Sequence, residues 1–272
     1  MAYKSSPRPN FDKPTHIKYK DMETYLWGDK EAGFIKDWIY ISNQYLHQII
    51  FGIEPRGYFK HSEEYRTIFG ADELLYVLSG VLIINNPMTG ETHKIKKDES
   101  VFFRKNTWHH AFNYSDEYLQ VLEFFSPPPS TGTSGVYAKA QPFLNKSKYI
   151  RSINHFDKSF KNEDSFKIIK EKNYVWGMLG SNQDILVATL IETEYLKVNK
   201  IYLTSNQETP YLKFKKQVIF LSLSNNILFD IKNNNKKNNL SLKDGLFLTE
   251  NTECLFKNNS KKDGFLIYCE AI

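Results

Sequence analysis

Short apolar runs separated by turn residues dominate the first half of the chain. The turns are marked by Gly70, Ser79-Gly80 and Thr89-Gly90. Side chains alternate between the two faces of a strand, so these runs predict half-buried and buried strands rather than helices. The expected strands cover residues 38–42, 46–53, 73–78, 81–84, 92–95, 100–104, 109–113 and 119–125. Short strands at hairpin spacing predict an all-β jelly roll or small barrel.

The second half of the chain repeats the first. Residues 173–177, NYVWG, align with residues 24–28, TYLWG, and residues 251–254, NTEC, align with residues 106–109, NTWH. The same alignment matches Glu73 with Gln217, His109 with Cys254 and Asn113 with Asn258. Self-similarity that keeps its order predicts two barrels in one chain, the second without the glutamate and histidines of the first but with its asparagine.

Composition changes divide the chain into four parts. Residues 1–20 are polar and contain three prolines, which predicts an extended N-terminal arm. Residues 21–127 form the expected first barrel, and residues 166–272 the second. Residues 128–165 are the expected connector. The stretch PPPSTGTSG at 127–135 is expected to be neither central strand nor helix, because proline removes backbone donors.

Composition also narrows the class of protein. The chain is 41% hydrophobic and 25% charged, which is typical of a soluble protein. No apolar run approaches the ~20 residues of a membrane helix, and the first ten residues lack the apolar core of a signal peptide. Two cysteines, Cys254 and Cys269, are too few for a disulfide framework and suit a reducing compartment. We therefore expect a cytoplasmic protein that does not bind membranes.

The net charge of +5 does not indicate a nucleic-acid partner. Basic residues are spread along the chain and form no cluster larger than adjacent pairs such as Lys236-Lys237 and Lys261-Lys262. Binding to a phosphate backbone needs clustered positive charge. A small-molecule partner fits the sequence better.

Two short motifs carry candidate chemistry. Glu73 is followed by six residues and Gly80, and His109 is followed by three residues and Asn113. This pair of motifs resembles the two motifs of the cupin superfamily. The resemblance implies tandem double-stranded β-helix barrels, that is, a bicupin whose second barrel is degenerate.

The resemblance also implies a metal site in the first barrel. Cupins usually hold one divalent metal with two histidines and a glutamate of the first motif and a histidine of the second. Carried over to this chain, the ligands would be His61, Glu63, Glu73 and His109, with a glutamate in the place of one histidine. Imidazole with carboxylate suits Fe, Mn, Ni or Zn. A one-residue register shift would make His110 the ligand in place of His109.

Tyr65 and Arg66 are the catalytic candidates. They lie in the loop that precedes Glu73, where a phenol could take a proton and a guanidinium could anchor a carboxylate or phosphate. The alternative is a tyrosine that packs in the loop and an arginine in solvent.

The cupin fold does not by itself determine a reaction. The first hypothesis is a metal-dependent enzyme, with a dioxygenase slightly favoured, acting on a small polar or anionic metabolite. A metal-dependent lyase, decarboxylase or isomerase remains open. So does a non-catalytic ligand-binding or sensor protein, or a structural module. The resemblance also implies a homodimer, in which the arm before Tyr25 could cross to a partner.

Overall fold

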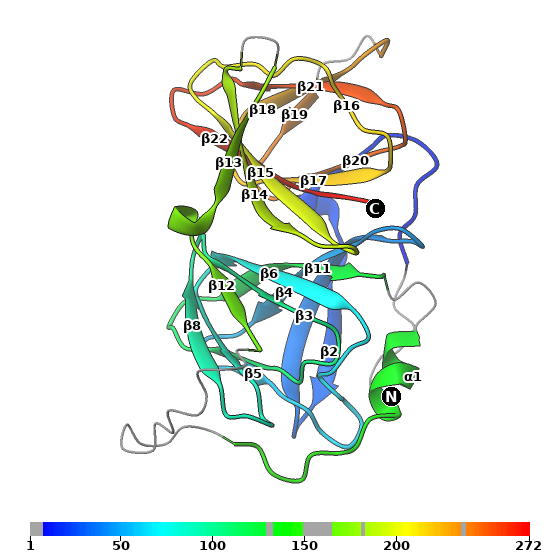
Figure 1. The fold of residues 1–272 in the computed structure, drawn as a ribbon, viewed down its shortest axis with the longest axis vertical. Helices are drawn as coiled ribbons and strands as arrows, with labels where there is room; N and C mark the ends of the chain where they lie inside the picture. Colours follow the sequence, from blue (N-terminus) through cyan, green and yellow to red (C-terminus); the bar gives the residue numbers. More distant parts are fainter. Residues whose placement is uncertain (1–7, 129–132, 149–164, 181–182, 235–237) are drawn as a thin grey trace. The chain divides into compact units, whose positions relative to one another are not determined.

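The computed structural model describes residues 8–128, 133–148, 165–180, 183–234 and 238–272, which fold into two compact units (Figure 1). The first unit contains Arg8 and the described residues between Thr24 and Lys172. The second contains Pro9–Glu23 and the described residues between Asn173 and Ile272. Each unit is a barrel of antiparallel strands, so the predicted tandem jelly-roll architecture is confirmed. No described helix is long and apolar enough to cross a membrane.

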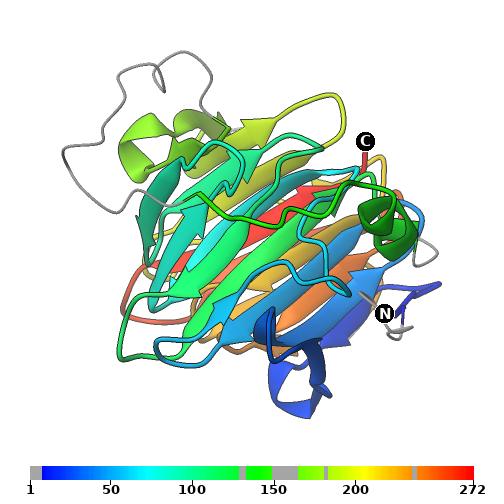
Figure 2. The same cartoon turned by 90° about the horizontal axis from the view of Figure 1, so that it is seen from below.

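The first barrel is one continuous sheet in the order β12-β9-β6-β11-β4-β3-β5-β10-β7-β8, with β2 paired to β3. Its strands lie side by side in Figure 2. The bounds are β2 Tyr25–Asp29, β3 Gly33–Ser42, β4 His47–Ile53, β5 Tyr58–Phe59, β6 Asp72–Ser79, β7 Val81–Asn85, β8 Thr92–Lys96, β9 Ser100–Phe103, β10 His110–Asn113, β11 Leu119–Ser126 and β12 Lys167–Ile169.

The second barrel repeats this arrangement as two sheets, in the orders β1-β20-β17-β22-β15-β14-β13 and β16-β21-β18-β19. Two 3₁₀ turns, Tyr19–Asp21 and Glu171–Asn173, precede β2 and β13. The strand bounds are β1 Thr15–Ile17, β13 Val175–Leu179, β14 Ile185–Glu192, β15 Lys197–Leu203, β16 Leu212–Lys213, β17 Val218–Ser222, β18 Ile227–Ile231, β19 Asn238–Leu240, β20 Gly245–Leu248, β21 Glu253–Asn258 and β22 Gly264–Glu270.

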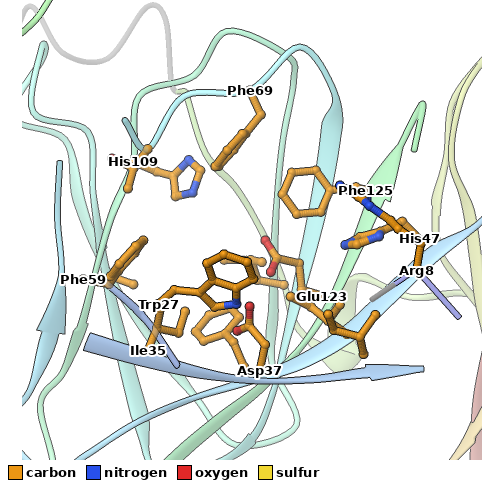
Figure 3. Close-up of a pocket in the computed structure, with 16 residues that line it drawn as sticks. Arg8, Trp27, Ile35, Asp37, His47, Phe59, Phe69, His109, Glu123 and Phe125 are labelled. Carbon is orange, nitrogen blue, oxygen red and sulfur yellow. The ribbon is translucent and has the colours of Figure 1, made fainter. Parts of the chain in front are cut away.

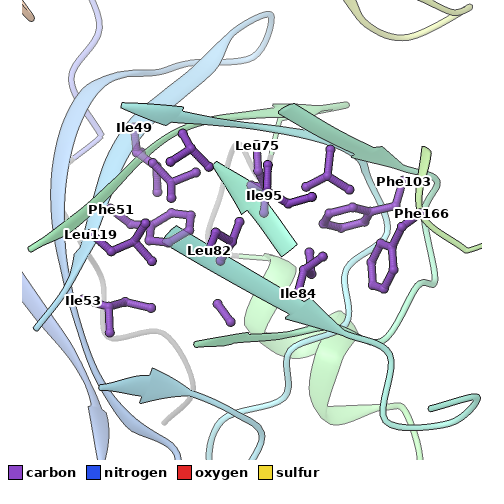
Figure 4. Packing of buried hydrophobic residues seen from close by; sticks show 14 of the residues in the cluster. Ile49, Phe51, Ile53, Leu75, Leu82, Ile84, Ile95, Phe103, Leu119 and Phe166 are labelled. Atoms are coloured by element: carbon purple, nitrogen blue, oxygen red, sulfur yellow. The ribbon is translucent and has the colours of Figure 1, made fainter. Parts of the chain in front are cut away.

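Alternate residues of each strand build the barrel cores. On β4, Ile49, Phe51 and Ile53 share one face and belong to the same core cluster as Leu75 of β6 and Leu82 of β7 (Figure 4). Full burial of each such side chain stabilises the fold by about 1.5–3 kcal/mol. The period-two pattern therefore produces both the strands and the core they enclose.

Strand pairing defines which residues of the two barrels are equivalent. Glu73 is paired with Phe103, and Val218 is paired with Leu248, so both pairs differ by the same 145 residues (218 − 73 and 248 − 103). The counterpart of Glu73 is therefore Val218, not Gln217 as the sequence alignment predicted. A shift of one residue in the alignment of a strand assigns every side chain of that strand to the opposite face.

A buried asparagine provides independent support for the duplication. Asn113 Nδ2 donates to the carbonyl oxygens of Ile53 and Glu54 at 3.1 Å each and of Glu117 at 2.7 Å. Asn258 Nδ2 makes the same bonds to the carbonyls of Leu203, Thr204 and Lys262, again at 3.1, 3.1 and 2.7 Å. Each amide thus ties two loops of its barrel together.

The units do not follow the expected domain ranges. Most of the expected N-terminal arm belongs to the second unit, and β12, which was expected in the second barrel, belongs to the first. β1, in the N-terminal arm, pairs with β20 of the second barrel, and β12 pairs with β9 of the first. Residues 127–135 were expected to contain no helix, but helix α1, Thr133–Lys139, begins within this stretch. Residues 1–7 of the arm and residues 129–132 and 149–164 of the connector lie outside the described part.

We expect Asn113→Ala and Asn258→Ala to destabilise their barrels by similar amounts. Each change removes the three hydrogen bonds that Nδ2 donates and the two that Oδ1 accepts from the backbone N–H and the hydroxyl of Ser115 or Ser260, at a cost of about 2–4 kcal/mol. Urea denaturation followed by fluorescence would measure this loss. Asn259→Ala changes an exposed neighbour and should stay within about 0.5 kcal/mol of the unsubstituted protein. Equal stability of the Asn258 and Asn259 variants would contradict this role for the buried amide.

Candidate functional site

The first barrel encloses a cavity of about 90 Å³ (Figure 3). Strands β2, β3, β4, β6, β10 and β11 provide most of its walls, and the loop before β6 provides Thr67 and Phe69. The lining is mainly aromatic and aliphatic, with a few polar groups among them. Its residues are Arg8, Trp27, Ile35, Asp37, Ile39, His47, Ile49, Phe51, Phe59, Thr67, Phe69, Leu75, His109, Ala111, Glu123 and Phe125.

The second barrel fills the corresponding space with aromatic rings. Strand pairing matches Leu75, Ala111 and Glu123 of the cavity wall with Phe220, Phe256 and Tyr268. The ring of Phe220 lies 4.7 Å from that of Phe256 and 5.0 Å from that of Tyr268, centroid to centroid. The same backbone thus encloses a packed aromatic cluster in one barrel and a cavity in the other.

Ionisable residues of the first barrel stand at positions where the second barrel has core residues. Asp37 is paired with Phe51, and Val187 with Ile201, at a common offset of 150 residues (187 − 37 and 201 − 51). The four inward positions that are polar in the first barrel are apolar or aromatic in the core of the second: Asp37 matches Val187, Glu73 matches Val218, His109 matches Cys254 and Glu123 matches Tyr268. Packing alone does not require polar residues there.

Glu73 and Glu123 form a hydrogen-bonded carboxyl pair. They lie on the neighbouring strands β6 and β11 and are only 1% and 7% exposed. Burial raises the pKa of Glu123 to about 8, and burial together with the charge of Glu123 raises the pKa of Glu73 well above its ordinary value. A pair of this kind holds a proton at neutral pH and can give it up or take it back.

His109 stands next to this pair as a neutral imidazole. Its Nδ1 lies 3.2 Å from the carbonyl oxygen of Thr107, a contact that requires a proton on Nδ1 and leaves Nε2 as the acceptor. Nε2 lies 3.7 Å from Glu73 Oε2. Burial lowers the pKa of His109 to about 4, and the ring of Phe103 packs 4.7 Å away.

Asp37 completes the acidic part of the cavity. Its carboxyl and that of Glu123 both project into the central space, beside the ring of Trp27 (Figure 3). Burial, and then the charge of Glu123, raises the pKa of Asp37 well above its ordinary value. Its Oδ1 atom has no hydrogen-bond partner among the described residues.

Arg8 and His47 lie at one side of the cavity. Arg8 Nη1 donates to Ser42 Oγ at 2.8 Å, and His47 Nδ1 lies 2.9 Å from the same oxygen. Burial lowers the pKa of His47 to about 3, with Arg8 contributing through its charge. His47 is therefore neutral, and Arg8 is the lining residue that carries a positive charge.

The four residues expected to hold a metal do not come together. Glu73 and His109 meet in the cavity, but His61 Nδ1 lies 2.5 Å from His110 Nε2, and His61 Nε2 lies 2.7 Å from the carbonyl oxygen of Leu144. The side chain of Glu63 is exposed. Within the described part of the chain, no three His, Cys, Asp or Glu residues are arranged to hold a metal ion. The expected ligand set therefore does not fit a divalent metal.

Neither catalytic candidate lines the cavity. Tyr65 is buried against Trp27 and Ala32, and its ring lies 6.2 Å from that of Phe59. Arg66 Nη1 donates to the carbonyls of Ser62 and Glu63 at 3.2 and 3.1 Å, and its guanidinium stacks 4.7 Å from the ring of Phe143. Both residues hold the loop in place.

The sequence analysis missed Asp37 and Glu123. Glu123 interrupts the apolar run LQVLEFF of β11, and Asp37 stands on the inward face of β3 next to β-branched and aromatic residues. For Glu123, a single carboxylate in a run that otherwise reads as core is the signal that could have identified it. Asp37 follows Lys36 and offers no such signal.

Comparisons with known proteins agree with the architecture. Residues 69–125 match a family model described as a cupin domain, whereas a search of curated protein sequences gave no match. AerE from Microcystis aeruginosa is similar in structure, with a TM-score of 0.59 and 11% identity over 96% of this chain and 97% of that chain. Protein YlbA from Escherichia coli gives a TM-score of 0.66, with 8% identity over 100% and 95% of the two chains. A formate complex of oxalate decarboxylase from Lactobacillus farciminis gives 0.64, with 9% identity over 97% and 88%. These identities are low, and the similarity concerns the fold.

We expect Glu123→Gln to make the stability of the first barrel less dependent on pH. Between pH 4.5, the ordinary pKa of a glutamate, and about 8, the unfolded chain has lost the Glu123 proton and the folded chain keeps it. The unfolded state then binds fewer protons, so the free energy of unfolding falls as pH rises, by up to about 1.4 kcal/mol per unit. Glutamine does not ionise, so this contribution to the pH dependence of the free energy of unfolding is absent from the variant.

Urea denaturation at several pH values between 5 and 8 would compare the unsubstituted protein with Glu123→Gln. Glu117→Gln, at an exposed position, is the control and should keep the original slope. Identical slopes for all three proteins would mean that Glu123 ionises normally in the folded state.

Proposed function

We propose that this chain, whose residues 69–125 match a cupin domain, binds a small polar molecule inside its first barrel and exchanges a proton with it through Glu73 and Glu123. The second barrel serves as a structural domain. The proposed reaction class is acid–base chemistry, as in lyases, decarboxylases and isomerases.

The replacement of three aromatic residues carries this proposal. Phe220, Phe256 and Tyr268 fill the second barrel, and the equivalent Leu75, Ala111 and Glu123 leave a cavity in the first. An unfilled cavity costs stability, as does a buried carboxylate. A binding site explains why the first barrel contains both.

The arrangement of the polar groups supports proton transfer. The Glu73–Glu123 pair shares protons, and the unprotonated Nε2 of His109 lies 3.7 Å from Glu73 Oε2. A bound molecule that contacts Glu123 could therefore take a proton from it. Glu73 could then pass a proton to Glu123. Groups positioned in this way contribute about 10²–10⁴-fold to proton-transfer reactions.

A metal-dependent dioxygenase has less support from the same residues. That prediction rested on four ligands, two of which, His61 and Glu63, lie away from Glu73 and His109. The proposal therefore relies on the side chains of the cavity alone.

We expect Ala111→Phe to abolish ligand binding while the protein stays folded. Phenylalanine occupies the equivalent position in the second barrel as Phe256, so the backbone accepts it, and here it would fill the cavity. Thermal shifts with a panel of small polar metabolites would identify ligands of the unsubstituted protein, and titration calorimetry would measure the loss. Ala111→Leu is a second, smaller filling variant.

Phe256→Ala is the matched control. It should open a cavity in the second barrel and destabilise it by about 3–5 kcal/mol without changing ligand affinity. Bound compounds would then be followed by NMR in D₂O. Deuterium uptake that Glu123→Gln abolishes would support proton transfer, and binding without exchange or conversion would identify a non-catalytic binding protein. Ligands whose affinity Ala111→Phe leaves unchanged would contradict the proposed site.

We also expect the protein to retain much less than one divalent metal per chain. Elemental mass spectrometry after exposure to Fe, Mn, Ni and Zn salts and desalting would measure the content. His61→Ala, His109→Ala and Glu73→Gln should not change it. A stoichiometric metal that is lost in the Glu73 and His109 variants would favour the metal-dependent enzyme.

A further inference from the structure

Three carboxyl groups of the first barrel lie in an apolar interior without a cation beside them. Asp37 and Glu123 project into the centre of the cavity, and Glu73 is hydrogen-bonded to Glu123. Among the described residues, no Lys or Arg nitrogen lies within 4.0 Å of these carboxylates. Buried carboxylates are normally paired with a cation or bound to a metal. Within the described part of the chain, these three carboxyl groups therefore have no Lys or Arg in direct contact.

The nearest basic side chains of the lining do not fill this role. Arg8 is held at the side of the cavity by its bond to Ser42 Oγ. His47 and His109 face the cavity but are neutral, since burial lowers the pKa of both. The positive charge is left for a ligand to supply.

Unpartnered oxygen atoms indicate which kind of cation would fit. Thr67 lines the cavity, is only 2% exposed, and its Oγ1 has no hydrogen-bond partner among the described residues. The same is true of Asp37 Oδ1 in the lining and of Glu73 Oε2 behind it. All three atoms can accept hydrogen bonds. A protonated primary amine offers three N–H donors and one positive charge.

The aromatic and aliphatic side chains of the lining could contact the hydrocarbon part of such an amine. The rings of Trp27, Phe59, Phe69 and Phe125 surround the carboxyl groups (Figure 3). Aromatic faces attract cations, by about 0.5–2 kcal/mol each when solvent is excluded. Ile39, Ile49 and Phe51 provide an apolar wall for a short hydrocarbon chain.

We propose that the first barrel is specific for a small protonated primary amine, whose ammonium group is bound by Asp37 and Glu123 and whose short apolar chain packs against the aromatic and aliphatic wall. This inference rests on the proposed function, because it assigns a substrate class to the same cavity. It keeps the expectation of a polar metabolite and replaces the anionic alternative with a cationic one. The surplus of carboxyl groups over cations inside the barrel accounts for the difference.

Three compounds of similar size and different charge test the proposal: butylammonium, 1-butanol and pentanoate. Titration calorimetry at pH 8.5, above the raised pKa of Glu123, should give butylammonium at least about tenfold tighter binding than 1-butanol with the full-length protein, since only the ammonium group can pair with the ionised carboxylate. Pentanoate should bind more weakly than either. Asp37→Asn and Glu123→Gln should each reduce the preference for the amine over the alcohol about tenfold, and the exposed Glu117→Gln should leave it unchanged.

Ala111→Phe separates failure of this inference from failure of the proposed site. If 1-butanol or pentanoate binds as tightly as butylammonium and Ala111→Phe abolishes that binding, the amine inference is overturned and the cavity remains a binding site. If butylammonium does not bind, the amine inference is also overturned. If it binds and Ala111→Phe has no effect, both proposals are overturned. Amine-selective binding that requires Asp37, Glu123 and the open cavity would establish the substrate class.

Discussion

The unfavourable burial of carboxyl groups in an apolar barrel is the constraint on which the site depends. Glu73 and Glu123 reduce this cost by sharing a hydrogen bond and by retaining protons, which the raised pKa of Glu123 reflects. Asp37 lies close enough for its ionisation to be disfavoured by Glu123. Protonation therefore lowers the cost of burying the three groups.

The duplication provides an internal comparison for this reasoning. Both barrels use the same strand order and the same buried amide, Asn113 or Asn258, so their backbones impose the same restrictions. Their inward side chains differ at the positions of the cavity. Where the second barrel contains a filled core, the first has lost aromatic volume and gained carboxyl groups. The difference is therefore not a requirement of the fold.

Residues that resemble a metal motif have a structural role in this chain. His61 and His110 contact each other, and His61 packs against Trp108 and Phe143, with ring centroids 5.2 and 5.6 Å away. The contact of His61 with the carbonyl of Leu144 attaches the segment after α1 to the barrel. The imidazoles thus connect loops, and Glu63 is left in solvent.

The sequence by itself determined most of the strands and the duplicated barrel, because strand periodicity is local and turn residues mark the strand ends. The resemblance to cupins, and not periodicity, placed Glu73 and His109 on the inner face. The sequence could not show that Asp37 and Glu123 meet in the same cavity, since β3 and β11 are brought together only by the closed sheet. It also could not show that His61 turns toward His110 instead of Glu73. Those contacts depend on the path of the loops and on packing between segments distant in sequence, and only the tertiary structure decides them.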